Sequence, residues 1–206
     1  MSRSLFTSRG TSLRSEVNQA ALKEFLSLDA LNFATQVHGT NILFVDSLDQ
    51  PRIEADAVIT QLPKIGVGVL TADCLPILID GGDIVAAEHA GRRGLLAGII
   101  ESVVDQMASK SSHRPDTFRA TIGPSICGRC YEVSDEMYKE LTTDFPTLKQ
   151  GVGERRLNLQ AEALHRLRSV GVSFIRDMQI CTLEDPRYFS YRGGDISDRQ
   201  AAVIAL

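Results

Sequence analysis

Three residues of this chain stand where reactive or metal-binding side chains are expected, namely at the ends of apolar segments. His38 in TQVHGT and His89 in AAEHAG each end such a segment and precede a glycine, so each imidazole is predicted where a strand emerges into a loop. Cys74 lies between two apolar runs, and Pro76 stiffens this connection by fixing its own φ and restricting the residue before it. The three residues are therefore a candidate Cys/His/His site.

A site of this composition is typical of catalytic zinc, because three protein ligands leave one coordination position open. Zinc would hold the sulfur of Cys74 as a thiolate and lower the pKa of a bound water toward neutrality. The sequence separations, 36 and then 15 residues, match no short metal-binding motif. Ordinary packing of a cysteine and two histidines at strand ends therefore stays open as the alternative.

The other histidines and cysteines suggest less chemistry. His113 lies in a polar loop and His165 in an amphipathic helix beside two arginines, so both are predicted to be solvated. Cys127 and Cys130 form one C-x-x-C without a second such pair. We interpret them as two loop thiols beside the core rather than as a structural zinc site.

A possible anion site follows His89. The segment Gly91-Arg92-Arg93-Gly94 leads directly into a predicted helix, so free backbone N–H groups and two guanidinium groups face one loop. Phosphate is commonly bound in this way. The alternative is that both arginines are solvated residues of the first turn, although cations there oppose the helix dipole.

Apolar periodicity predicts a mixture of strands and single helices, with a hairpin at Gly81-Gly82. Helices are predicted over Ser15–Leu28, over about four turns that include Leu96 to Met107, over Asp135–Thr142 after a Ser134 cap, and over Leu159–Val170 between Asn158 and Gly171. Strands are predicted at Asn41–Val45, Ala55–Thr60, Val67–Thr71, Pro76–Asp80, Ile84–Ala87, Thr117–Ile122, Met178–Thr182 and Ala201–Leu206.

This pattern indicates an α+β fold, a single α/β sandwich of mixed sheets with flanking helices, and one domain over residues 1–206. The net charge of −4 and the absence of long basic clusters argue against nucleic acid or a membrane surface as partner. The sequence contains no signal-peptide pattern and no apolar stretch of membrane-spanning length, so we expect a cytoplasmic protein with reduced thiols. No nucleotide-binding motif is present.

Six blocks of the sequence resemble the laccase-domain family in the order expected there. They are QVHGTNI, EADAVIT, TADCLPILI, AAEHAGRRG, IGPSICGRCYEV and the tail from CTLEDPRYFSYRGGD to the C-terminus. Members are also called polyphenol oxidase-like or peptidoglycan-editing proteins, and many are described as purine nucleoside phosphorylases. The resemblance covers the chain from about Phe6 to Leu206 and implies a single α/β sandwich, also likened to bacterial deamidating toxins with a Cys–His pair.

The resemblance implies that His38, Cys74 and His89 bind one metal ion, zinc rather than copper, since one Cys/His/His set is too small for a multicopper cluster. It implies phosphorolysis of adenosine, inosine and methylthioadenosine to base and ribose 1-phosphate, with adenosine deamination at the same site. The expected partners are a nucleoside and phosphate, and the expected state is a monomer or homodimer. The remaining expected site residues are Asp73 as a general base or loop-orienting group, Arg9, Arg92 and Arg93 for phosphate, and Ser190 and Arg192 in the cleft.

The chain departs from the family pattern at several positions. Arg92 replaces a tryptophan, Glu88 replaces an apolar residue, Asp198 stands where glycine is common, and the N-terminal block is short. Two alternatives to the phosphorylase therefore stay open. Cys74 could act as a nucleophile with His89 as its base in an amidase or deamidase acting on a cell-wall precursor, or the chain could be a non-catalytic metal-binding module.

Overall fold

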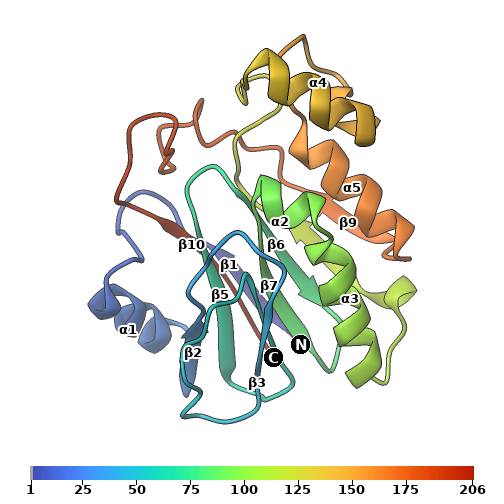
Figure 1. The fold of residues 1–206 in the computed structure, drawn as a ribbon. Coiled ribbons are helices and arrows are strands. Elements are labelled where there is room, and N and C mark those ends of the chain that lie inside the picture. Colours follow the sequence, from blue (N-terminus) through green and yellow to red (C-terminus); the bar gives the residue numbers. More distant parts are fainter. Residues whose placement is uncertain (1) are drawn as a thin grey trace.

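The protein, described here over residues 2–206 of a computed structural model, forms two stacked β-sheets flanked by helices (Figure 1). The strands are β1 (Arg3–Phe6), β2 (Ala30–Phe33), β3 (Ile42–Val45), β4 (Ala57–Thr60), β5 (Ile65–Thr71), β6 (Leu75–Asp80), β7 (Val85–Ala90), β8 (Arg119–Ile122), β9 (Phe174–Asp177) and β10 (Gln200–Ala205). The helices are α1 (Glu16–Phe25), α2 (Arg92–Leu96), α3 (Ile99–Lys110), α4 (Asp135–Asp144) and α5 (Leu159–Ser169), with 3₁₀ turns at Pro115–Thr117 and Pro146–Lys149.

Both sheets mix parallel and antiparallel neighbours. The smaller sheet has the order β1-β10-β5-β2, in which β2 and β5 are parallel. The larger sheet has the order β3-β4-β7-β6-β8-β9, and its two outermost pairs are parallel while the central pairs are antiparallel. The predicted α+β class with mixed sheets is therefore confirmed.

Successive side chains on each strand point to opposite faces of its sheet, and this alternation produces three apolar layers. On β10, Ala202 and Ile204 face the larger sheet, whereas Ala201 and Val203 face the side on which α1 lies. The opposite face of the larger sheet packs on α3 and α5, which contribute buried residues such as Val103 to the largest core cluster. Helix α1 therefore covers one side of the sandwich, and α2 to α5 cover the other (Figure 1).

The structure corrects three expectations about the elements. The predicted strand Met178–Thr182 is wrong: β9 ends at Asp177, and Gln179 has a φ of 54°, which takes the chain out of the sheet. The single helix predicted after Gly91 is two helices, because Gly98 adopts a φ of 95° between α2 and α3. Strands β1 and β2 were not predicted, since each is four residues long and neither is flanked by a clear turn signal.

Several strand ends meet at one end of the sandwich. The chain leaves the smaller sheet after Thr71 and enters the larger sheet at Leu75, so residues 72–74 cross between the two layers. Leu75 pairs with Ala90 at the end of β7, which places His89 beside this crossing. No helix within residues 2–206 is both long and apolar enough to span a bilayer.

Candidate metal centre and cavity

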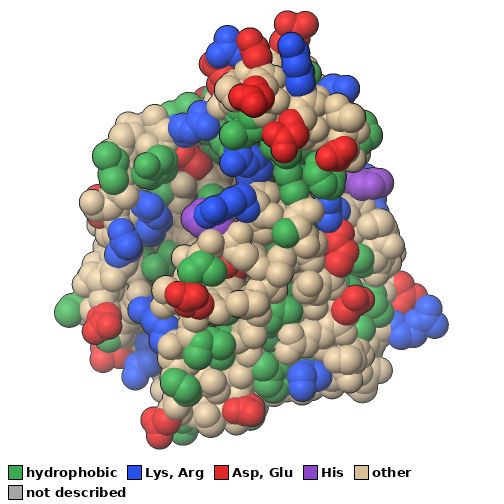
Figure 2. Space-filling view, viewed as in Figure 1, with side chains coloured by type: hydrophobic (Ala, Val, Ile, Leu, Met, Phe, Trp, Pro, Cys, Tyr) green, Lys and Arg blue, Asp and Glu red, His purple; other side chains and the backbone are tan. Residues whose placement is uncertain are grey.

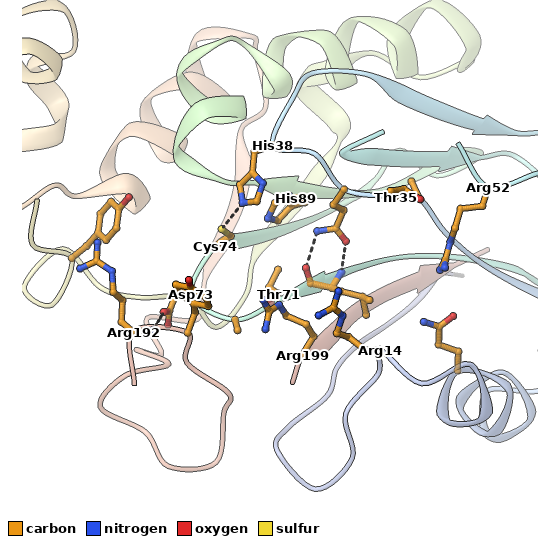
Figure 3. A pocket seen from close by; sticks show the side chains of 17 residues that line it. Arg14, Thr35, His38, Arg52, Thr71, Asp73, Cys74, His89, Arg192 and Arg199 are labelled. Atoms are coloured by element: carbon orange, nitrogen blue, oxygen red, sulfur yellow. Dashed lines mark hydrogen bonds between the residues drawn. The ribbon is translucent and has the colours of Figure 1, made fainter. Parts of the chain in front are cut away.

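The structure brings His38, Cys74 and His89 together from three separate segments. His38 lies in the loop between β2 and β3, Cys74 in the crossing between β5 and β6, and His89 near the end of β7 (Figure 3). Their candidate ligand atoms all lie within 4.8 Å of one another, and Cys74 Sγ is 3.9 Å from His38 Nε2. The two imidazole rings meet edge to face, with their centroids 4.8 Å apart.

Asp56 holds both histidines in place. This fully buried carboxylate accepts the backbone N–H groups of His38 at 2.9 Å and Gly39 at 2.7 Å, which supports the left-handed backbone of His38 at a φ of 62°. The same carboxylate lies 2.7 Å from His89 Nδ1. Because Nδ1 is engaged, Nε2 of His89 remains as the ligand atom, and a carboxylate on the other ring nitrogen is typical of metal-bound histidine.

Two glycines of HAGRRG allow the close approach of these segments. A Cβ on Gly91 would lie 2.8 Å from the ring of His38 and 3.4 Å from Cys74 Sγ. A Cβ on Gly94 would lie 2.6 Å from the carbonyl oxygen of Gly39. A side chain at either position would therefore push α2 away from the loop that carries His38.

The electrostatics of the centre favour a thiolate. Burial opposes ionisation of Cys74, but hydrogen bonds and charge from His38 and His89 outweigh it and lower the pKa of the thiol to about 6. Burial likewise opposes the charged form of His89, yet Asp56 and then Cys74 raise its pKa to about 9. Both shifts favour a thiolate–imidazolium pair at neutral pH in the metal-free protein.

The donor set fits a single soft or borderline metal ion. One thiolate and two imidazoles are ligands that zinc prefers, and the carboxylate on His89 Nδ1 fixes the tautomer required for coordination. His38 is exposed, His89 is 3% exposed and Cys74 is half-buried, so the cluster opens to one side only. Three protein ligands facing an accessible cavity are the composition of a catalytic rather than a structural site.

Asp73 is bound on all of its oxygens. Its side chain accepts hydrogen bonds from the Thr182 hydroxyl at 2.7 Å and from the Arg192 backbone N–H at 2.8 Å, and its carbonyl accepts the N–H of Ile126 at 2.9 Å. These contacts hold Asp73 in a left-handed conformation with a φ of 86°, directly before Cys74. They fit the second of its two predicted roles, that of orienting the loop.

A cavity of about 760 Å³ opens beside the three candidate ligands. Basic side chains gather where the surface is hollowed beside a histidine (Figure 2). The arginines that line the cavity are Arg14, Arg52, Arg192 and Arg199. Within residues 2–206 none of these four forms an ion pair. Burial and then the charge of Arg14 lower the pKa of Arg199, which indicates that the two guanidinium groups are near enough to repel each other.

The cavity includes some of the predicted substrate-binding residues but not others. Arg192 lines it, whereas Arg9, Arg93 and Ser190 do not. Arg9 pairs instead with Asp195, at 2.5 Å, and Arg93 is exposed on the surface of α2.

The other two predicted residues have neighbours that explain their positions. Ser190 is buried, and its hydroxyl accepts the N–H of Gly193. Arg92 points to the sulfur of Met137 in an adjoining pocket that shares Arg192 with the main cavity. A phosphate-binding role for Arg92 stays a prediction.

Glu88, one of the departures from the family pattern, lies on the opposite face of β7 from His89. It is fully buried, and neither of its carboxylate oxygens has a hydrogen-bond partner within residues 2–206. Burial and then the charge of Glu101 raise its pKa to about 8, so the side chain is neutral at neutral pH. Glu88 therefore belongs to the helix-packed core and not to the candidate metal centre.

Sequence reasoning missed several residues of the site. Asp56 lies in the quoted block EADAVIT, but a single aspartate before a strand gives no sign that it supports two histidines from elsewhere. Arg14 and Arg199 come from opposite ends of the chain and meet where the segment after β1 runs beside the start of β10, with the Leu13 N–H donating to the Arg199 carbonyl at 2.8 Å (Figure 3). Tyr131 and Tyr191 also line the cavity, and each follows a loop with no periodic pattern.

Comparison with known proteins agrees with this fold and site. A family model described as multi-copper polyphenol oxidoreductase laccase matches residues 8–206, and the chain belongs to this family. A purine nucleoside phosphorylase of Streptomyces coelicolor is 37% identical over 177 residues, which cover 83% of this chain and 73% of the relative. A purine nucleoside phosphorylase of Aquifex aeolicus is 33% identical over 184 residues, which cover 89% and 86% of the two chains. These names support a phosphorylase-like function.

Solved structures extend the likeness to the whole chain. A protein of Neisseria meningitidis superposes with a TM-score of 0.87 at 27% identity, covering 100% of this chain and 94% of that one. The protein YlmD of Geobacillus stearothermophilus superposes with a TM-score of 0.83 at 23% identity, covering 99% and 91%. The second likeness shows the fold alone.

Proposed function

We propose that this protein is a zinc-dependent purine nucleoside phosphorylase that converts adenosine, inosine or methylthioadenosine and phosphate to free base and ribose 1-phosphate. The observation that carries the proposal is the position of the Cys74, His38 and His89 cluster in a cavity lined by four arginines that form no ion pair with any residue from 2 to 206. When bound, zinc supplies a Lewis acid at this position. Adenosine deamination is proposed as a second reaction of the same cavity.

The cavity residues divide into two groups in this proposal. Arg14 and Arg199 bind phosphate, since two neighbouring guanidinium groups gain most from a doubly charged anion. Tyr131 provides an aromatic wall for the purine, and the guanidinium of Arg192 lies 5.0 Å from the centre of its ring. Phosphate attacks C1′ of the ribose, the glycosidic C–N bond breaks, and the purine leaves with the bonding electrons.

Incubation of zinc-loaded protein with inosine and phosphate tests the proposal. Hypoxanthine and ribose 1-phosphate should form in equal amounts, and no hypoxanthine release would overturn the phosphorylase assignment. Arg14→Gln should raise the KM for phosphate about tenfold, which corresponds to the loss of one charge-assisted hydrogen bond. Arg93→Gln is the matched control, because it removes an arginine that lies outside the cavity.

The thiolate–imidazolium pair favours a second candidate, in which Cys74 is the nucleophile and His89 the base of an amidase or deamidase. Metal removal and thiol alkylation separate the two candidates. Amide hydrolysis that survives a chelator but is abolished by alkylation of Cys74 supports the nucleophile. Activity that is lost on chelation and restored by zinc supports the metal-dependent phosphorylase.

A further inference from the structure

A second cluster of metal-ligand side chains lies outside the cavity. It consists of Cys127, Cys130, Cys181 and Glu184, whose candidate ligand atoms all lie within 4.8 Å of one another. We propose that these four residues bind one zinc ion as a structural site that is separate from the His38, Cys74 and His89 centre. The C-x-x-C that the sequence presents alone is thereby completed by a second turn 54 residues further along the chain.

Two tight turns present the four side chains. In the first turn the Cys130 N–H donates to the carbonyl of Cys127 at 3.0 Å, so these two cysteines project from one loop. In the second turn the Asp185 N–H donates to the carbonyl of Cys181 at 2.9 Å, which brings Cys181 and Glu184 to the same side. Pairs of ligands separated by two residues on such turns are typical of structural zinc sites.

A short β-bridge holds the two turns against each other. Ser125 pairs with Cys181 in parallel, with its N–H donating to Ile180 at 3.1 Å and its carbonyl accepting from Thr182 at 3.0 Å. The Cys127 N–H then points at Cys181 Sγ at 3.4 Å. These backbone hydrogen bonds therefore orient the four candidate ligands toward one another before any metal ion binds.

The distances suit a tetrahedral ion with little rearrangement. Glu184 Oε1 lies 3.4 Å from Cys130 Sγ, and Glu184 Oε2 lies 4.0 Å from Cys127 Sγ. Zinc–sulfur bonds of about 2.3 Å place tetrahedral sulfur ligands roughly 3.8 Å apart. The four candidate donor atoms, which all lie within 4.8 Å of one another, therefore need to move by only about 1 Å to occupy the vertices of a zinc tetrahedron.

The donor types indicate zinc rather than a hard cation. Three soft sulfur ligands select zinc over magnesium or calcium, and a carboxylate is an accepted fourth ligand.

The position of the site gives the ion a structural task. Ile126, next to Cys127, donates to the carbonyl of Asp73, and Thr182, next to Cys181, donates to the Asp73 carboxylate. Tyr131, next to Cys130, lines the cavity. An ion between the two turns would therefore brace the wall that supports the loop before Cys74.

Metal stoichiometry tests the proposal independently of activity. Zinc-loaded wild type, prepared under reducing conditions, should contain two zinc ions per chain by native mass spectrometry and elemental analysis. Cys74→Ala should contain one ion, the pair Cys127→Ser with Cys130→Ser should contain one, and the three changes together none. Any of three results would overturn the proposal of a second zinc site. They are a single zinc ion in wild type that Cys74→Ala abolishes, iron in place of zinc, and a Cys127–Cys130 disulfide in fresh protein.

A milder variant keeps the test decisive if the double serine variant does not fold. Glu184→Gln preserves shape and all three thiols, and it should release the second zinc ion to a chelator at least tenfold faster, as expected for a weakened ligand. Cobalt bound to Cys74→Ala should show sulfur-to-metal charge-transfer absorption that falls by about one third on Cys127→Ser, since three bonds become two. Unchanged chelator release and unchanged absorption would each exclude the proposed ligand set.

Discussion

The two cysteine-containing clusters of this protein are assembled in opposite ways. His38, Cys74 and His89 come from three strand ends, depend on the buried Asp56, and open into a cavity. Cys127, Cys130, Cys181 and Glu184 come from two turns, depend on backbone hydrogen bonds, and lie outside the cavity. Three ligands with an open position are typical of catalytic zinc, and four closed ligands are typical of structural zinc.

The electrostatic difference between the clusters follows from their neighbours. Cys74 faces two imidazoles, so positive partners stabilise its thiolate and lower its pKa. Burial raises the pKa of Cys130, and the neighbouring thiols and carboxylate raise it further. In metal-free protein the thiol of Cys74 is therefore expected to be reactive, whereas the thiol of Cys130 is expected to be unreactive.

The largest expected effect comes from removing the sulfur at the open centre. Cys74→Ala should lower the rate of phosphorolysis by about 1000-fold, because it removes one of the three ligands of the metal ion at the proposed catalytic centre. The measurement is hypoxanthine release from inosine at saturating phosphate. Cys130→Ser is the matched control, and its rate should stay within a few-fold of wild type. Equal losses in both variants would show that the two clusters do not differ in role.

A smaller effect should follow from weakening the support of the open centre. Asp56→Asn leaves an acceptor for the loop but removes the charge that orients His89, so zinc affinity at this centre should fall about 10- to 100-fold. Competition with a fluorescent chelator measures this affinity. Asp83→Asn is the comparison variant, since Asp83 accepts hydrogen bonds from Ser112 at the opposite end of β7 from His89. An unchanged affinity in Asp56→Asn contradicts the supporting role of the carboxylate.

The contrast between the clusters also explains what the sequence could predict. His38, Cys74 and His89 are recognisable because each stands at the end of an apolar run. This local pattern can be seen in the sequence without knowledge of the fold. Cys181 and Glu184 carry no such mark, because their role depends on the bridge from Ser125 to Cys181. The predicted strand at Met178–Thr182 was misplaced at this very bridge, where an apolar run forms one isolated pair instead of a strand.

For the same reason, the fold could be predicted from the sequence more completely than the residues that line the cavity. Strands such as β5 and β7 are nearly continuous apolar runs, so the sequence indicates them directly. Arg14 and Arg199 become neighbours only because the segment that follows β1 contacts the residue just before β10, a contact between distant segments. The arginines that the sequence favoured, Arg9 and Arg93, lie outside the cavity that the sheets create.

Thiol reactivity in metal-free protein gives a third comparison. Because the pKa of Cys74 is lowered to about 6, its alkylation rate should rise as the pH increases through 6 and then level off. Cys130 should react appreciably only in alkaline solution. At pH 7 Cys74 should react at least about tenfold faster than Cys130, although the weaker nucleophilicity of a low-pKa thiolate offsets part of its greater abundance.

Mass spectrometry after brief iodoacetamide treatment measures both rates on one sample. The double variant His38→Gln with His89→Gln is the matched control, because it removes the positive partners and should return the reactivity of Cys74 toward that of an ordinary thiol. Faster alkylation of Cys130 than of Cys74 at pH 7 would reverse the expected order and contradict the electrostatic contrast.

The smallest expected effect concerns Arg129, the charged neighbour of the second cluster. Its guanidinium lies 3.4 Å from Glu184 Oε2, but the two side chains are 72% and 49% exposed, so solvent screens their attraction. Arg129→Ala should therefore change the free energy of unfolding by no more than about 0.5 kcal/mol, measured by urea denaturation of the zinc-loaded protein. Asp56, by contrast, is fully buried against His89, and the loss of its charge leaves a desolvated partner unpaired. If Arg129→Ala destabilises the protein as much as Asp56→Asn, the exposed ion pair, and not backbone and metal, holds the two turns together.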